Sequence, residues 1–170
     1  MKKLVVSLSA VCMLLACNNK KQEDSNTNPV NETTTIPAND DKASKTGSFT
    51  IDGKTYTGDI TTQYFGDKTT GQYSVLCQQD DPLALLQAVF SNEKDALSGT
   101  PFKPAESFYS LEPGEVHIAL SGKAIGDMEF VTSSTSAGSI TVSAKTLVIK
   151  GLQVYNGDHQ EKIVNATISF

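Results

Sequence analysis

Apolar and polar residues alternate along the last stretch of the sequence, from Lys162 to Phe170. Successive side chains of a strand point to opposite faces, so a period of two is typical of a half-buried antiparallel β-strand. The buried face would carry Val164, Ala166, Ile168 and Phe170, and the other face is mainly polar. This pattern predicts that the chain folds by pairing strands.

Further segments have the composition of short strands and are separated by turn residues. Asp52-Gly53 is the strongest hairpin signal, because a type I′ turn needs a positive φ at both central positions. Asn156-Gly157 predicts the turn of the last hairpin. About eight strands predict an all-β fold, an antiparallel β-sandwich or a partly open barrel, within one domain of residues 48–170. The predicted strands are residues 48–51, 54–57, 60–65, 72–78, 115–120, 128–132, 139–144, 147–155 and 162–170.

Residues 83–90 fit two structures. Asp81-Pro82 is suited to begin a helix, with proline at the first helical position. The segment is equally suited to a buried strand that pairs with residues 72–78, and the surrounding strands favour this second prediction. Residues 92–110 contain Pro and Gly, which indicates a long connection, and we expect Phe102 and Phe108 to attach it to the core.

The first 16 residues have the three regions of a bacterial signal peptide. Lys2 and Lys3 give a positive start, and residues 4–15 form an apolar segment that is too short to span a membrane. The run Leu14-Leu15-Ala16-Cys17 follows the pattern of a lipobox. We therefore expect cleavage between Ala16 and Cys17, and acylation of Cys17 by chains such as palmitate, which anchor the protein in a membrane. The alternatives are an ordinary signal peptide that is cut near Ala10 or Ala16 and is not lipidated, and a buried core helix.

Residues 17–47 are expected to be a disordered linker behind the anchor. The segment is rich in Asn, Thr, Lys, Asp, Glu, Ser and Pro and has few large apolar residues, so it buries too little surface to offset the entropy of ordering. The sequence contains 14 basic residues, all lysine, against 19 acidic residues. This balance argues against nucleic acid as a partner, because binding phosphates requires clustered Lys and Arg.

Candidate reactive residues are few, and each has a structural explanation. His117 lies on the more polar face of a predicted strand, and we expect it to be solvated. His159 belongs to a predicted hairpin tip, which lacks the converging ligands that a metal requires. Cys77 lies in an apolar strand, where a small buried thiol is expected. We therefore predict no catalytic residue, no metal and no cofactor.

Acidic and aromatic residues complete the set of candidates. Asp80-Asp81, Asp127 and Glu129 are expected to be solvated turn residues. The tyrosines offer a weak ligand-binding hypothesis, since aromatic rings on strands stack on sugars. The three rings placed first as possible ligand contacts are Tyr56, Tyr64 and Tyr73, with Tyr109 and Tyr155 as further members of the set.

Three segments resemble the small, uncharacterised β-sandwich lipoproteins that are frequent in the Bacteroidetes. Residues 49–56 (FTIDGKTY) are similar to their opening hairpin, residues 137–142 (AGSITV) to an internal strand, and residues 150–154 with 168–170 to their closing hairpin. The resemblance implies a β-sandwich in the cell envelope and supplies no catalytic residues.

The sequence therefore predicts where the protein is located and indicates no catalytic activity. We expect a lipid-anchored lipoprotein of the bacterial outer membrane that acts as a non-enzymatic accessory protein beside an envelope protein partner. The alternative is a small module that binds a glycan or another envelope ligand. Whether the protein faces the periplasm or the cell surface is left open.

Overall fold

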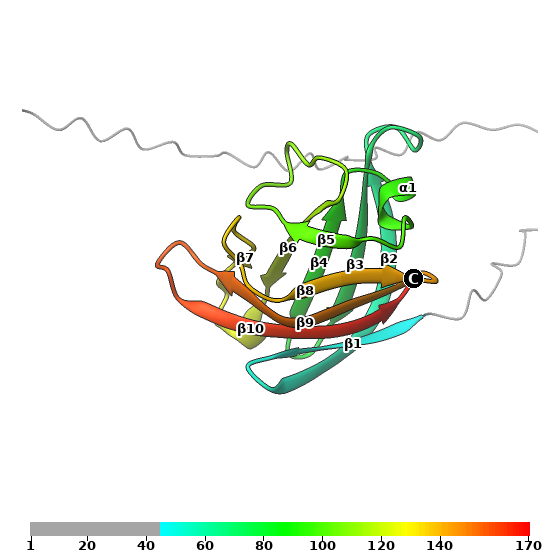
Figure 1. Cartoon of the computed structure of the whole chain (residues 1–170). Helices are drawn as coiled ribbons and strands as arrows, with labels where there is room; N and C mark the ends of the chain where they lie inside the picture. The colour runs from blue at the N-terminus through cyan, green and yellow to red at the C-terminus, as the bar shows by residue number, and fades with distance from the viewer. Residues whose placement is uncertain (1–44) are drawn as a thin grey trace, which may run out of the picture. The chain divides into compact units, whose positions relative to one another are not determined.

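The computed structural model describes residues 45–170, and these residues form ten strands in one sheet, which confirms the predicted all-β class (Figure 1). Two short helices accompany the strands, α1 (Glu93–Ala96) and the 3₁₀ helix η1 (Lys123–Ile125). The strands are β1 (Thr46–Ile51), β2 (Lys54–Phe65), β3 (Gln72–Gln79), β4 (Ala84–Phe90), β5 (Pro101–Pro104), β6 (Glu115–Ser121), β7 (Phe130–Val131), β8 (Ser139–Ser143), β9 (Thr146–Tyr155) and β10 (Glu161–Ser169).

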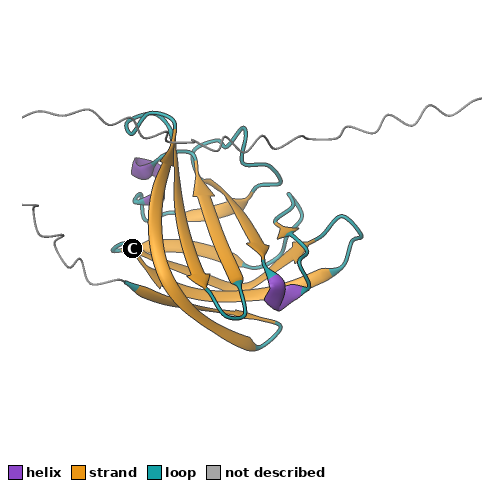
Figure 2. Ribbon diagram, turned by 180° about the vertical axis from the view of Figure 1, so that it is seen from behind, coloured by secondary structure: helices purple, strands orange, loops and turns teal. Residues whose placement is uncertain are grey.

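The sheet closes on itself like a barrel, which differs from the predicted sandwich and is nearer to the predicted alternative of a partly open barrel. Its order is β10-β1-β2-β3-β4-β6-β5-β8-β9, and β10 pairs with β9 to complete the ring. The two-residue strand β7 bridges β6 and β9. In Figure 1, β8, β9, β10 and β1 run across the view in front of β2, β3, β4 and β6, and Figure 2 shows the second group from behind.

Strand β2 forms the corner between these two groups. Its first half, Lys54–Asp59, pairs with β1, and its second half, Asp59–Phe65, pairs with β3. The sequence predicted two strands that end and begin around Gly58, but the structure has one continuous strand. Gly58 allows the corner, because a Cβ there would lie 1.9 Å from the carbonyl oxygen of Gln78 in β3.

The inward faces of the strands form one hydrophobic core. The alternation predicted for the last strand is confirmed, since Val164, Ala166, Ile168 and Phe170 are buried and their neighbours Asn165, Thr167 and Ser169 are exposed. In β6, Val116, Ile118 and Leu120 are likewise buried on the inward face. The barrel is thus filled by side chains, with the largest fully buried ones being Phe49, Phe90 and Phe130.

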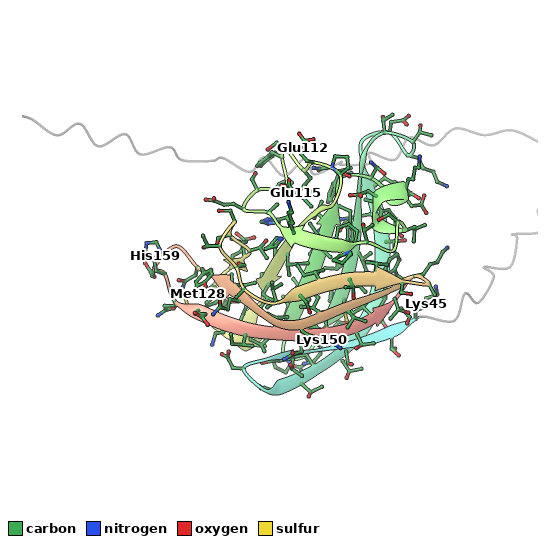
Figure 3. All side chains as sticks on the ribbon, in the orientation of Figure 1. Lys45, Glu112, Glu115, Met128, Lys150 and His159 are labelled. Carbon is green, nitrogen blue, oxygen red and sulfur yellow. The ribbon has the colours of Figure 1, made fainter. Side chains whose placement is uncertain are left out.

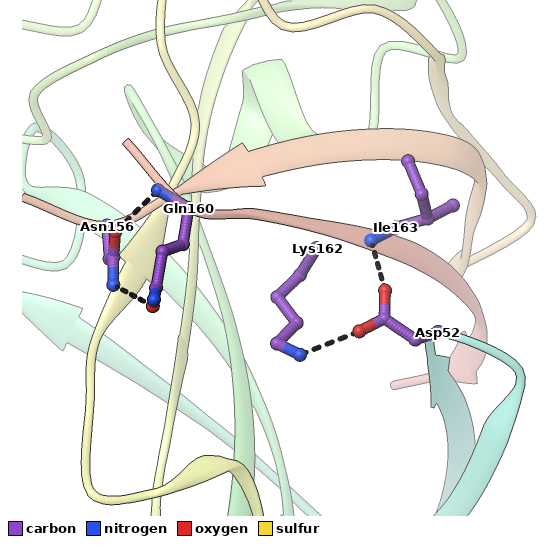
Figure 4. A network of polar contacts seen from close by, with 5 residues as sticks. All are labelled: Asp52, Asn156, Gln160, Lys162 and Ile163. Atoms are coloured by element: carbon purple, nitrogen blue, oxygen red, sulfur yellow. Dashed lines mark hydrogen bonds and ion pairs between the residues drawn. The ribbon is translucent and has the colours of Figure 1, made fainter. Parts of the chain in front are cut away.

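The predicted Asp52-Gly53 turn is confirmed, with φ values of 50° and 82°. Asp52 also ties this turn to β10 (Figure 4): its carboxylate accepts hydrogen bonds from the amide of Ile163 (2.9 Å) and from Nζ of Lys162 (2.7 Å). Partial burial acts to raise the pKa of Asp52, but these two hydrogen bonds and the positive charge of Lys162 outweigh it and lower the pKa below 3.8.

The ambiguous segment is a strand, as the sequence favoured: β4 pairs with β3 on one side and β6 on the other. The expected connection at residues 92–110 contains α1 and β5. Phe102 packs edge-on against Phe90 in the core, as predicted, with ring centroids 5.1 Å apart. Phe108 stays 36% exposed and lies outside the barrel wall, against His117.

The predicted signal peptide, the cleavage site at Ala16, the lipidated Cys17 and the linker up to residue 44 lie outside the described residues. The domain begins two residues before the predicted boundary, because β1 starts at Thr46. Among the helices of residues 45–170, none is long and apolar enough to cross a membrane.

Candidate functional site

An open groove of about 630 Å³ lies on the outer side of the barrel where β7 meets β9. This volume falls within the roughly 300–1,000 Å³ of sites that bind small molecules. Val131 and Tyr155, which face each other across the β7–β9 pairing, belong to its lining. The other lining residues come from four connecting segments: Glu106 after β5; Glu129 before β7; Thr132, Ser133 and Thr135 after β7; and Asn156, Gly157 and His159 between β9 and β10.

Thr132 fixes the loop that carries Glu106. Its hydroxyl donates to the carbonyl oxygen of Ala105 (2.6 Å) and accepts from the amide of Ile118 in β6 (3.1 Å). The ring nitrogen Nδ1 of His117 lies 3.0 Å from the same carbonyl oxygen of Ala105. These bonds are buried, where a lost partner is costly, so they hold this wall of the groove in place.

The loop after β7 is organised by its own hydroxyl groups. The amide of Ser133 donates to Oγ of Ser136 (2.9 Å), and the amide of Ser136 donates to the carbonyl oxygen of Ser133 (3.1 Å). Oγ of Ser133 also lies 2.9 Å from Oγ1 of Thr135. Serine and threonine form such local turns readily, because their hydroxyls reach the neighbouring backbone. Residues 133–136 therefore form an ordered rim of the groove.

The β9–β10 loop forms the third wall, and Asn156 organises it (Figure 4). Its side-chain oxygen accepts from the amides of Asp158 (3.1 Å) and Gln160 (2.8 Å), and its side-chain nitrogen donates to Oε1 of Gln160 (2.9 Å). The hairpin predicted from residues 147–155 and 162–170 is confirmed, and Asn156-Gly157 begins its loop. Pairing resumes only at Glu161, so five residues make the loop, and His159 takes the positive φ (60°).

The groups that remain available for a ligand are mostly acidic or hydroxylic. Within residues 45–170, neither Glu106 nor Glu129 has a hydrogen bond or an ion pair through its carboxylate. The phenol of Tyr155 donates to Oε1 of Gln153 (3.2 Å), which fixes the orientation of the ring. Met128 lies beside this end of the barrel with His159 (Figure 3), and its sulfur is 3.4 Å from the side-chain nitrogen of Asn156.

The three tyrosines that were proposed as possible ligand contacts, Tyr56, Tyr64 and Tyr73, do not form a surface patch. Tyr56 is buried and stacks on Phe49 with ring centroids 5.4 Å apart. Tyr73 is buried between Tyr64 and Phe170, at 5.3 Å and 6.0 Å. Tyr56 and Tyr73 occupy core-facing positions of β2 and β3, and Tyr64 is half-buried and packs against the core. Of the five tyrosines in the set, Tyr155 is the one that lines the groove.

Tyr64 makes one polar contact at the end of the barrel. Its phenol donates to Oε2 of Glu93 in α1 at 2.7 Å. This hydrogen bond, with smaller contributions from burial and from the charges of Glu93 and Tyr73, raises the pKa of Tyr64 to about 12. The phenol therefore stays protonated at physiological pH and serves to attach α1 to the sheet.

His117 is a correction to the sequence prediction. It does lie on the outer face of β6, opposite to Val116 and Ile118, but it is only 5% exposed. The connection after β5 covers it, through Ala105 and through Phe108, whose ring centroid lies 5.9 Å from that of His117. The alternation of the strand identified the face, but it could not show that a loop would pack over it.

The remaining candidates are in the predicted places. Cys77 is buried in the core, and this burial raises the pKa of its thiol, which keeps it protonated. Asp80, Asp81, Asp127 and Glu129 are exposed in turns. Within the described part of the chain, no three His, Cys, Asp or Glu side chains gather closely enough to hold a metal ion.

The sequence alone did not indicate the groove. Glu106 and Glu129 are separated by 23 positions and by β6, and neither belongs to a motif. Comparison of the chain with protein-family models, with curated proteins and with solved structures found no match.

Proposed function

We propose that the protein is a lipid-anchored, non-enzymatic binding protein of the bacterial envelope, and that its barrel binds a glycan in the groove beside Tyr155. The observation that supports this proposal is the groove itself: an aromatic ring, two carboxylates and the hydroxyls of Ser133 and Thr135 line one concave surface. Sugar-binding sites combine these elements, because a ring covers the apolar face of a sugar and polar groups bind its hydroxyls.

The walls of the groove also favour binding. Thr132, Ser133 and Asn156 each fix a loop through hydrogen bonds that need no ligand. A preformed site loses less conformational entropy when a ligand binds, so a weak set of contacts is enough for measurable affinity. The predicted anchor at Cys17 would hold such a site close to the envelope.

A glycan array with the purified lipoprotein, followed by calorimetry of the best ligand, tests the proposal. We expect Tyr155→Ala to weaken binding by about two- to twelvefold, which corresponds to the 0.5–1.5 kcal/mol of an aromatic contact. Tyr109→Ala is the matched control, because Tyr109 is 84% exposed and lies outside the groove. Equal affinity of the Tyr155→Ala variant and the wild type would contradict the proposed site.

A second function is favoured by a different surface. Phe108 and Tyr109 are exposed together on the loop before β6, with ring centroids 4.1 Å apart. Exposed aromatic side chains are frequent hot spots of protein interfaces, so this pair supports the accessory role beside an envelope protein. Crosslinking in intact cells distinguishes the two functions. If the protein binds an envelope partner through this pair, Tyr109→Ala should abolish the crosslink and Tyr155→Ala should not.

The anchor has its own test. Cys17→Ala should accumulate unprocessed precursor and lose the incorporation of labelled palmitate. Continued labelling of this variant would show that the membrane attachment does not depend on Cys17.

A further inference from the structure

We infer that the groove selects sugars that carry a free, protonated amino group over neutral and acidic sugars; this inference rests on the proposed function. The groove supplies Glu106 and Glu129 as negatively charged groups, and no lysine belongs to its lining. A protonated amine of a hexosamine would therefore meet opposite charge, whereas a uronic acid would be repelled.

The two carboxylates are free to take this role. Within residues 45–170 the one ion pair is that of Lys162 with Asp52, so neither groove glutamate is neutralised by a lysine. A bound ammonium group would replace water around these carboxylates with charge-assisted hydrogen bonds, which are stronger than neutral ones. The contact would form at the surface, where such pairs remain sensitive to salt.

The ring of Tyr155 adds a second reason for a cationic ligand. The face of a tyrosine ring attracts an ammonium group through its quadrupole. Its phenol is directed to Gln153, so the ring itself is the part offered to the groove.

The charge of the whole barrel acts in the same direction. Residues 45–170 contain nine lysines and fourteen acidic residues, which gives a net charge of −5. A negative protein attracts cationic ligands and raises their rate of association at low ionic strength. Ser133 and Thr135 on the rim add hydroxyls, which suit a sugar more than a simple polyamine.

The experiment compares three probes by calorimetry at low salt: the tetramer of glucosamine, the tetramer of N-acetylglucosamine and spermidine. We expect the glucosamine tetramer to bind at least about tenfold more tightly than the acetylated one, and more tightly than spermidine. Glu106→Gln combined with Glu129→Gln should remove this preference, so that the two tetramers bind with similar affinity. Raising the salt should have the same effect as the double substitution.

The matched control is Glu112→Gln, which removes one negative charge from the same loop as Glu106 but outside the groove (Figure 3). It should keep the preference. Equal binding of both tetramers would overturn the amine selectivity while leaving the glycan site intact, and equal binding of spermidine would overturn the requirement for a sugar. Absence of binding by both tetramers, together with a negative glycan array, would overturn the proposed function itself.

Discussion

Gly58→Ala tests the corner that closes the barrel. The new Cβ would lie 1.9 Å from the carbonyl oxygen of Gln78, 2.1 Å from its carbonyl carbon and 2.5 Å from the amide nitrogen of Gln79. Packed carbon atoms in proteins approach to about 3.5 Å. All three clashing atoms belong to the backbone of β3, so no side chain can rotate away, and β2 and β3 must separate by more than 1 Å.

The cost follows from what this separation breaks. Overpacking of a closed interior costs about 1–3 kcal/mol, and each backbone hydrogen bond lost between the strands adds about 1 kcal/mol. We therefore expect Gly58→Ala to lower the free energy of unfolding by about 3–4 kcal/mol, a large part of the 5–15 kcal/mol that stabilises a typical domain. The melting temperature should fall by about 10 °C.

Urea unfolding followed by far-UV circular dichroism measures this change, since the chain has no tryptophan. Gly157→Ala is the matched control: its φ lies outside the left-handed region, and an added Cβ meets no atom within 4 Å. The control should stay within about 0.5 kcal/mol of the wild type. If Gly58→Ala unfolds at the same urea concentration and with the same slope as the wild type, the corner does not depend on the glycine.

Two further predictions concern hydrogen bonds that join distant segments. Asp52→Asn should lower the free energy of unfolding by up to about 1 kcal/mol at pH 7. Because folding lowers the pKa of Asp52, this loss of stability should shrink as the pH falls below about 4. A difference between the variant and the wild type that persists at pH 2 would refute the charge argument. Thr132→Val should cost about 2–3 kcal/mol in the same urea assay, since it leaves the buried amide of Ile118 without its acceptor. Thr135→Val, on the exposed rim, should change stability by less than about 0.5 kcal/mol, and equal losses in the two valine variants would contradict the role of Thr132.

Local patterns were enough to predict most strands and the faces that they bury. The alternation in β10 and the positive φ of Asp52 and Gly53 depend on residues that are close in sequence, and both predictions were confirmed. The last hairpin was also predicted correctly, with its loop beginning at Asn156-Gly157. The asparagine side chain bonds to the amides of Asp158 and Gln160, and these bonds stabilise the loop of five residues.

The candidate site was less predictable, because its residues come from separate loops. Tyr56, Tyr64 and Tyr73 were proposed as ligand contacts on the ground that tyrosine stacks on sugars, but Tyr56 and Tyr73 are buried in the core and Tyr64 packs against it. Tyr155 has the same chemistry and lines a groove. Tyr155 differs from the other three in lying on a strand face that is not covered by the core, and the residue type alone does not indicate which face is covered.

The sequence by itself determined that this chain is built from strands, which residues of β10 and β6 face inward, and where the first hairpin turns. These properties depend on side-chain periodicity and on the φ angles that single residues adopt. The tertiary structure decided that β9 pairs with β10 to close the sheet, that a loop buries His117, and that Glu106, Glu129 and Tyr155 share one groove. These outcomes depend on contacts between segments far apart in the chain, so no local pattern contains them.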